Sequence, residues 1–185
     1  MKWIKKDFIF NADKLVPWAV SGAMIPTPFE LDDNTIRVYL TFLDSSGIGR
    51  CGFIDLNKQN LTEVKGYSDK PIFDIGLPGT FDENGALTCS VCESRNGELY
   101  FYYAGFELGT KIRYRLLTGL AITDKNLNLV KKIPTPVLER TPEELFFRGG
   151  PFCIYDKKVH TYKMWYVAGS DWMEIDGKNM PVYEI

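Results

Sequence analysis

The sequence predicts an all-β fold in which four-stranded antiparallel blades repeat along the chain, the arrangement of a β-propeller. The first observation is an aromatic strand that occurs three times, and aligning Tyr39, Tyr102 and Trp165 gives a period of roughly 63 residues. The second is a series of short apolar segments separated by turn residues within each period. The third is that no long segment has a helical period.

The expected strands follow one another in the same order in each unit. A short strand at 8–10 leads into the first unit, and the charged strand at 129–132 is typical of an exposed edge. One helical turn is expected at 141–147, with Thr141 as its N-cap and Pro142 at the first helical position. Strands are expected at 18–26, 36–43, 50–56 and 61–64 in the first unit, at 86–93, 98–104, 117–123 and 129–132 in the second, and at 149–155, 162–168 and 181–185 in the third.

The strand at 98–104 is apolar on both faces. Side chains alternate along a strand, so Leu99 and Phe101 point to one side while Tyr100 and Tyr102 point to the other. A sandwich strand has one polar face in solvent, whereas a blade is packed between two neighbouring blades. The pattern therefore favours a propeller, with a β-sandwich as the alternative.

The composition describes a globular chain without a strong electrostatic preference. Of the 185 residues, 45% are hydrophobic, which excludes a disordered chain, and the formal net charge is −2. A nearly neutral chain has no broad attraction to nucleic acid or to an anionic membrane, so neither is expected as a partner. The sequence has no apolar run of the roughly 20 residues that a membrane span needs, and residues 1–8 lack a signal-peptide pattern. We therefore expect a cytoplasmic protein.

The four cysteines are expected to be buried free thiols. Cys89 and Cys92 have a CxxC spacing, but residues three apart on a strand point to opposite faces. The sequence offers no second Cys or His pair that would complete a zinc site. We therefore expect neither a metal nor another cofactor.

Several segments resemble the five-bladed propeller glycosidases and glycoside phosphorylases, a group that includes arabinanase, levansucrase and invertase types and the β-mannoside phosphorylases. The resemblance covers most of the chain from Trp18 onward, and it implies a carbohydrate substrate. The segments that carry it are 81–85, 97–105, 118–124, 136–140 and 163–169.

Members of this group place carboxylates from their first three blades in a central funnel, and the match here is partial. Asp82 precedes the inner strand of the second blade, and Glu143 and Glu144 hold the equivalent place in the third, so the resemblance implies catalytic roles for them. The innermost strand of the first blade, 21–28, contains no acid. Its absence counts against simple hydrolysis. It counts less against phosphorolysis, for which Arg148 would help to hold the phosphate.

Further substrate-binding candidates follow from the repeat. Asp44, Glu107 and Asp171 come at equivalent places after the three aromatic strands and are expected on one rim, where their alternative role is to solvate turns. Arg148 is either a sugar or phosphate clamp or a rim ion pair, and Trp172 is either a sugar-stacking platform or part of the core. The alternative function is a non-catalytic glycan-binding or scaffold propeller. Two carboxylates about 5–10 Å apart in a concave, aromatic-lined pocket would favour the enzyme.

The chain is expected to form a single domain, 1–185, that contains an incomplete ring of about two and a half to three blades. The blades are expected at approximately 18–66, 80–135 and 146–185. Five such blades need roughly 300 residues or more, so we expect a truncated propeller whose last strand, 181–185, has no partner. Its open apolar face and strand edge predict self-association.

Overall fold

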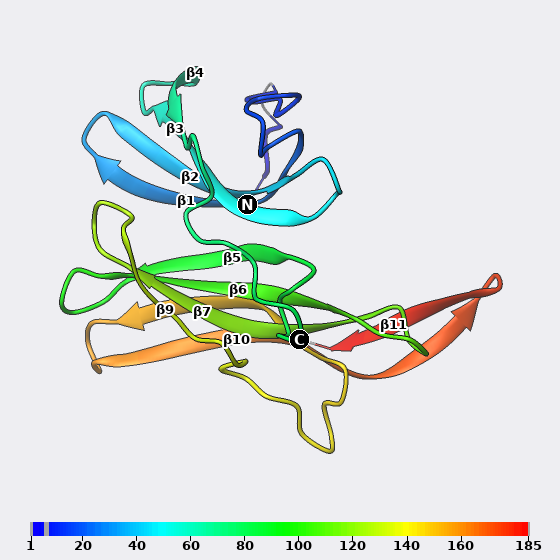
Figure 1. Ribbon diagram of the computed structural model, residues 1–185. Coiled ribbons are helices and arrows are strands. Elements are labelled where there is room, and N and C mark those ends of the chain that lie inside the picture. The colour runs from blue at the N-terminus through cyan, green and yellow to red at the C-terminus, as the bar shows by residue number, and fades with distance from the viewer. Residues whose placement is uncertain (1, 6–7, 185) are drawn as a thin grey trace.

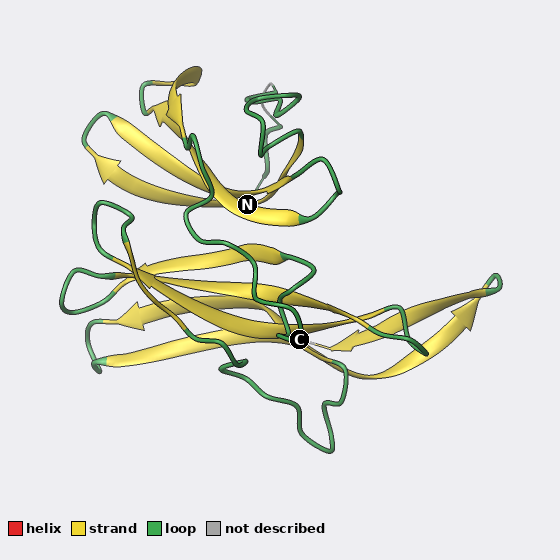
Figure 2. Cartoon of the chain, viewed as in Figure 1, coloured by secondary structure: helices red, strands yellow, loops and turns green. Residues whose placement is uncertain are grey.

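The computed structural model describes residues 2–5 and 8–184, and every regular element within them is a β-strand (Figure 1). The eleven strands of this described part form two sheets, one in the order β1-β2-β3-β4 and one in the order β11-β10-β9-β7-β6-β5, with β8 paired to β7. Loops connect all of them (Figure 2). The strands are β1 (Ser21–Asp32), β2 (Thr35–Leu43), β3 (Gly49–Asn57), β4 (Asn60–Tyr67), β5 (Ala86–Glu93), β6 (Leu99–Leu108), β7 (Tyr114–Thr123), β8 (Leu129–Lys132), β9 (Phe147–Asp156), β10 (Thr161–Ile175) and β11 (Lys178–Glu184).

The all-β expectation is confirmed. Among the described residues there is no apolar helix of a length that could cross a membrane.

Blade one, β1 to β4, is an antiparallel meander whose tight turns are closed by its own polar residues. Between β1 and β2, the Asp32 carboxylate accepts a hydrogen bond from the Asn34 N–H at 2.7 Å. Between β2 and β3, Asp44 accepts the N–H groups of Ser46 at 2.8 Å and Ile48 at 3.0 Å. In each case the carboxylate bonds backbone N–H groups of its own turn and so fixes the chain reversal. The four strands expected in this unit are present, and β1 continues to Asp32.

Blades two and three are joined edge to edge in the larger sheet. Blade two consists of β5 to β8 and blade three of β9 to β11. Strands β7 and β9 run parallel and pair at Leu116↔Phe147 and Leu117↔Arg148. Gly149 permits this close approach, because a Cβ there would lie 2.9 Å from the Cβ of Leu116. Through this contact blades two and three form one sheet, whereas the sequence repeat predicts two separate sheets.

The expectation that the last strand lacks a partner is wrong. β11 folds back on β10, with Met173 opposite Met180 and Trp172 opposite Pro181. The reversal is made at Asp176 and Gly177, whose φ values of 52° and 73° are the positive values that a two-residue hairpin turn requires. Ile185, the final residue of the expected strand, lies outside the described residues.

Two smaller expectations are also wrong. Residues 8–10 belong to no strand, and residues 141–146 form bends rather than a helical turn. The capping contact expected there does form, because the Thr141 hydroxyl accepts the Glu144 N–H at 3.2 Å. The strand β9 begins at Phe147, so the chain extends before a helical turn can close.

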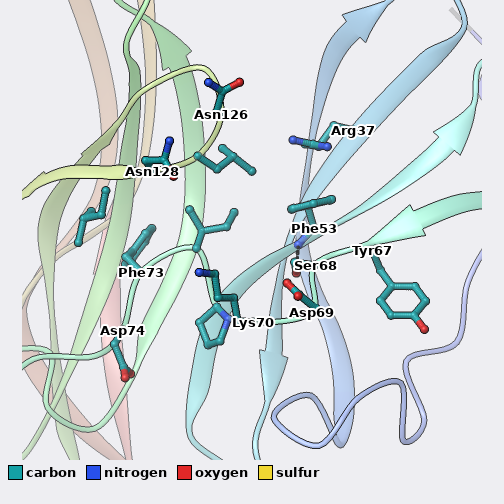
Figure 3. Close-up of a pocket in the computed structure, with 14 residues that line it drawn as sticks. Arg37, Phe53, Tyr67, Ser68, Asp69, Lys70, Phe73, Asp74, Asn126 and Asn128 are labelled. Atoms are coloured by element: carbon teal, nitrogen blue, oxygen red, sulfur yellow. Dashed lines mark hydrogen bonds between the residues drawn. The ribbon is translucent and has the colours of Figure 1, made fainter.

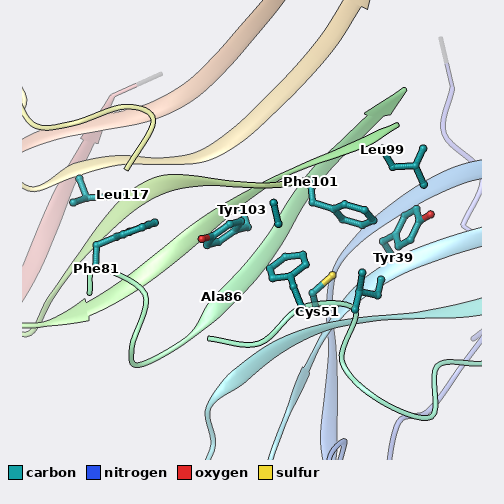
Figure 4. Packing of buried hydrophobic residues seen from close by; sticks show 11 residues of the cluster. Tyr39, Cys51, Phe81, Ala86, Leu99, Phe101, Tyr103 and Leu117 are labelled. Atoms are coloured by element: carbon teal, nitrogen blue, oxygen red, sulfur yellow. The ribbon is translucent and has the colours of Figure 1, made fainter. Parts of the chain in front are cut away.

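The main core lies between blade one and blade two and is built from aromatic side chains (Figure 4). Tyr39 of β2 packs edge-on against Phe101 of β6, with ring centroids 5.0 Å apart. Phe73, from the 68–85 linker between β4 and β5, packs against both Phe101 and Tyr103. On its other side blade one is covered by the N-terminal segment, where Trp18 meets Phe42 edge-on at 5.5 Å.

Strand β6 is covered on both faces, as its sequence pattern predicted. Phe101 and Tyr103 face blade one, and both are fully buried. On the opposite face, Tyr100 stacks on Tyr162 of blade three with centroids 5.9 Å apart. A strand covered on both faces fits a blade between two neighbours and not a sandwich strand with a solvated face.

Candidate functional site

The first strands of the three blades, β1, β5 and β9, lie together and line a shared groove. The Thr27 hydroxyl of β1 donates to the Cys89 carbonyl of β5 at 3.1 Å. The Cys153 N–H of β9 donates to the Ser90 hydroxyl of β5 at 3.0 Å. The groove between these strands has a volume of about 510 Å³, and Glu93 is the one acidic residue among those that line it. The groove is therefore poor in carboxylates.

Asp82, the expected blade-two acid, does not reach this groove. Its side chain is 1% exposed and lies between the 68–85 linker and blade two. Oδ2 accepts the Tyr103 hydroxyl at 2.9 Å and pairs with Lys132 Nζ at 2.6 Å, while Oδ1 accepts the Thr80 hydroxyl at 3.0 Å. Burial, followed by the charge of Asp82, raises the pKa of Tyr103. The contacts with Tyr103 and Lys132 tie the linker to blade two, and the contact with Thr80 lies within the linker.

Glu144, in the loop before β9, forms a compact cluster with Arg148 and Tyr166. Its Oε2 lies 2.5 Å from Arg148 Nε, and the Tyr166 hydroxyl lies 3.2 and 3.3 Å from the two carboxylate oxygens. Arg148 Nη2 donates to the same hydroxyl at 3.0 Å, and Nη1 donates to the Glu139 carbonyl at 2.6 Å. The hydrogen bond with Tyr166, and then Glu144, raise the pKa of Arg148. The guanidinium therefore carries a fixed positive charge beside the carboxylate.

The Glu144 cluster, defined as Glu144, Arg148 and Tyr166, is partly open to solvent. The side chain of Glu144 is 27% exposed and that of Arg148 is 17% exposed. Glu143 differs from its neighbour, because its side chain is exposed and its carbonyl accepts the Ser170 hydroxyl. Sequence reasoning did not single out Tyr166, because its contact with Arg148 depends on the pairing of β9 with β10.

The three rim candidates are each engaged by a different partner. Asp44 pairs with Arg50 at 3.1 Å, and Glu107 pairs with Arg115 at 3.1 Å. The exposed Asp171 accepts the N–H of the next residue at 2.8 Å. Burial alone would raise the pKa of Asp44. The turn N–H groups and Arg50 lower it by more than burial raises it, so the net shift is downward. These contacts support the turn and ion-pair roles. None of the three partners contacts more than one of the three acids.

Trp172 is packed among aromatic side chains. Its ring lies 5.5 Å from Phe147 and 5.6 Å from Tyr114, measured between centroids. Its indole N–H is buried and has no hydrogen-bond partner in the described chain. This position matches the alternative in which Trp172 belongs to the core.

Neither Asp82 nor Glu144 lines any of five cavities of about 330 to 610 Å³, so none of these five brings the two acids together. Within the described ranges there is also no cluster of three or more His, Cys, Asp or Glu side chains that could hold a metal ion.

No family model matches the sequence. Two curated relatives, the uncharacterized proteins MT1551 and Rv1502 of Mycobacterium tuberculosis strains CDC 1551 / Oshkosh and ATCC 25618 / H37Rv, are each 25% identical over 174 residues. The match covers 94% of this chain and 57% of each relative. The chain thus spans little more than half the length of the curated relatives it matches.

Two solved structures share the fold. A sucrose-6-phosphate hydrolase from Lactobacillus gasseri superposes with a TM-score of 0.59 at 17% identity, covering 82% of this chain and 30% of that protein. A thermostable family-43 glycoside hydrolase superposes with a TM-score of 0.58 at 18% identity, covering 83% of this chain and 48% of that protein. The likeness is one of fold. The propeller fold predicted from the sequence is confirmed, and its structural neighbours are glycoside hydrolases.

Proposed function

We propose that this chain is a carbohydrate-active module of the propeller glycosidase and glycoside phosphorylase type, acting on glycosidic bonds. The observation that carries the proposal is the Glu144 cluster, a partly exposed carboxylate fixed by a cation and a phenol beside the first strand of blade three. The fold, which glycoside hydrolases share, supports it. Fold alone does not assign an activity, so the proposal depends on what this cluster does.

Glu144 is the acid proposed to contact the sugar. Cleavage of a glycosidic bond needs a proton donor for the leaving oxygen and a carboxylate, or an anion such as phosphate, at the anomeric carbon. The Glu144 carboxylate is held by charge-assisted contacts in one orientation, which suits a base or an acceptor of sugar hydroxyl groups. Arg148 supplies the positive charge that a phosphate would need, and Glu143 is the second acid of the same loop.

Asp82 is proposed to position other groups rather than to contact substrate. Its two oxygens are satisfied by Tyr103, Thr80 and Lys132, and the side chain is buried. A carboxylate with these contacts cannot meet a sugar without breaking them. Its place in the mechanism is to hold the 68–85 linker against blade two.

The second candidate function is non-catalytic glycan binding. It is favoured by the buried, fully paired Asp82 and by the lack of an acid in residues 21–28 of β1. In this case the Glu144 cluster would accept and donate hydrogen bonds to a glycan without cleaving it.

The experiment is turnover of a panel of nitrophenyl glycosides and disaccharides, with and without inorganic phosphate. The Glu144→Gln variant is compared with Glu174→Gln, which changes an exposed acid on β10. We expect Glu144→Gln to lower kcat/KM by about 10²- to 10⁴-fold, the usual range for loss of an acid or base, and Glu174→Gln to leave it unchanged. Binding by calorimetry without turnover would favour the second candidate. Equal turnover of the two variants would contradict the role of Glu144.

A further inference from the structure

A separate cleft of about 610 Å³ lies between blade one and blade two (Figure 3). One side is formed by β2, β3 and the end of β4, with residues 68–74 of the linker beside them, and the other side by the turn between β7 and β8. We call it the interblade cleft. It shares no lining residue with the inner groove or with the Glu144 cluster.

The blade-one side of the cleft carries a flat stack of Arg37 on Phe53. The guanidinium carbon lies 3.8 Å from the ring centroid. Nε and Nη2 each donate to a different oxygen of Asp55 at 2.7 Å, which fixes the guanidinium plane.

The linker wall is held in place by backbone and side-chain hydrogen bonds. The Ser68 N–H donates to the Phe53 carbonyl at 3.0 Å, and the Ser68 hydroxyl accepts the Phe53 N–H at 3.0 Å. Four residues later the Ile72 N–H donates to the Cys51 carbonyl at 3.0 Å. These contacts anchor the wall to β3.

The opposite wall is equally fixed. Asp124 accepts the N–H groups of Asn126 and Asn128 at 2.8 Å each, and its second oxygen accepts the Asn128 side-chain amide at 2.8 Å. Leu127 between them turns into the core and has a φ of 63°. The exposed Asn126 side chain is thus presented to the cleft from a rigid turn (Figure 3). Because both walls are already fixed, a ligand that enters loses little binding free energy to ordering them.

The lining matches a neutral, hydroxyl-rich ligand better than an anion. The charges of the lining balance, with Arg37 and Lys70 against Asp69 and Asp74. Arg37 and Asp74 are also paired with Asp55 and Arg50, which lie outside the lining. Planar amide, guanidinium and carboxylate groups can bond neighbouring hydroxyls of a sugar. The volume falls within the roughly 300–1,000 Å³ of small-molecule sites.

We propose that the interblade cleft binds a neutral saccharide unit and is a second carbohydrate site remote from the Glu144 cluster. The site goes beyond the proposed function, because it needs no catalysis and uses none of the same residues. A second site on a glycan chain would raise the local concentration of that chain at the first.

The test is a titration of the isotope-labelled chain with sucrose, maltose and cellobiose, followed by backbone amide NMR shifts, with inorganic phosphate as a separate anionic probe. We expect at least one disaccharide to shift the amides of residues 67–70, 72–74 and 126–129 saturably, with a Kd of about 1 mM or weaker. Asn126→Ala should weaken this Kd at least about fivefold, the loss of one hydrogen bond. Asn96→Ala, in the exposed β5–β6 turn, should leave it unchanged.

Three results would overturn the proposal: disaccharide shifts confined to the Glu144 cluster, equal affinities of Asn126→Ala and Asn96→Ala, or shifts in the cleft produced by phosphate and by none of the sugars. The two proposals fail independently. Saturable shifts in the cleft of the Glu144→Gln variant support the second site whatever that variant does to turnover.

Discussion

Replacing Asp82 by Asn tests whether this acid is structural or catalytic. The substitution keeps the shape of the side chain but removes its charge at a position that is 1% exposed. Lys132, whose side chain is 17% exposed, then loses its ionic partner at 2.6 Å. An amide can still accept from Tyr103 and can donate to the Thr80 hydroxyl, which itself donates to the Leu77 carbonyl, so the main change is the loss of the negative charge.

The expected cost is about 3 kcal/mol. Removing one partner of a fully buried ion pair costs roughly 3–5 kcal/mol, because the other charge is left buried. Here the lower end applies, because Lys132 Nζ also donates to the Asp74 carbonyl at 2.6 Å and is not completely buried. For a domain of this size, about 3 kcal/mol lowers Tm by roughly 6–12 °C.

Calorimetry and urea unfolding would measure the effect, with Asp69→Asn as the matched control on the exposed part of the linker. The control should change the free energy of unfolding by no more than about 0.5 kcal/mol. A cycle with Lys132→Met should give a coupling energy of about 1–3 kcal/mol between the two residues. If Asp82→Asn unfolds like the parent but abolishes turnover, then Asp82 is catalytic and the structural argument is refuted.

Three further predictions concern other parts of the chain. Asp44 has a lowered pKa in the fold, so its stabilising contribution is present above its unfolded pKa of about 3.9 and is lost as pH falls below that value. The free energy of unfolding, measured with urea between pH 2 and 6, should therefore depend less on acid in Asp44→Asn than in the parent. Gly119→Ala would place a methyl group in the ring of buried Tyr103 and should cost about 1–3 kcal/mol by thermal unfolding, whereas no change would mean that the ring can shift. Trp165 and Phe152 are 50% and 55% exposed on the open face of blade three, so Trp165→Glu should reduce concentration-dependent self-association in analytical ultracentrifugation; equal sedimentation of both chains would exclude this face as the contact.

The repeat and most strands could be predicted from the sequence because they depend on local patterns. Strand β5 was expected at 86–93 and β8 at 129–132, and both have those bounds. Alternation of apolar side chains and the turn residues between them are properties of neighbours in the chain. The hairpin at Asp176 and Gly177 had a local signal too, an Asp-Gly pair, and it was missed because the last strand was assumed to have no partner.

The site was less predictable because its contacts are remote in sequence. Asp82 stands just before an inner strand, where the resemblance implied an active-site acid. Its partner Lys132 comes fifty residues later, on the outer strand β8, and was read only as a charge on an exposed edge. Glu144 and Arg148 are four residues apart and were both singled out, but Tyr166 joins them only through the pairing of β9 with β10. Nothing local to any of these residues encodes that register.

The burial of Asp82 has a consequence for the interblade cleft, because one linker serves both. Residues 68–85 supply Phe73 to the core, Asp82 to the ion pair with Lys132, and the segment 68–74 to the cleft wall. Lys132 bridges the last two of these, since its ammonium contacts both Asp82 and the Asp74 carbonyl. Loosening the ion pair should therefore weaken binding in the cleft, while the Glu144 cluster, held by the loop before β9, keeps its geometry. Asp82→Asn would then lower saccharide affinity at the cleft and leave the affinity of the Glu144 cluster unchanged, and equal losses at both places would mean that the linker is not the element that separates them.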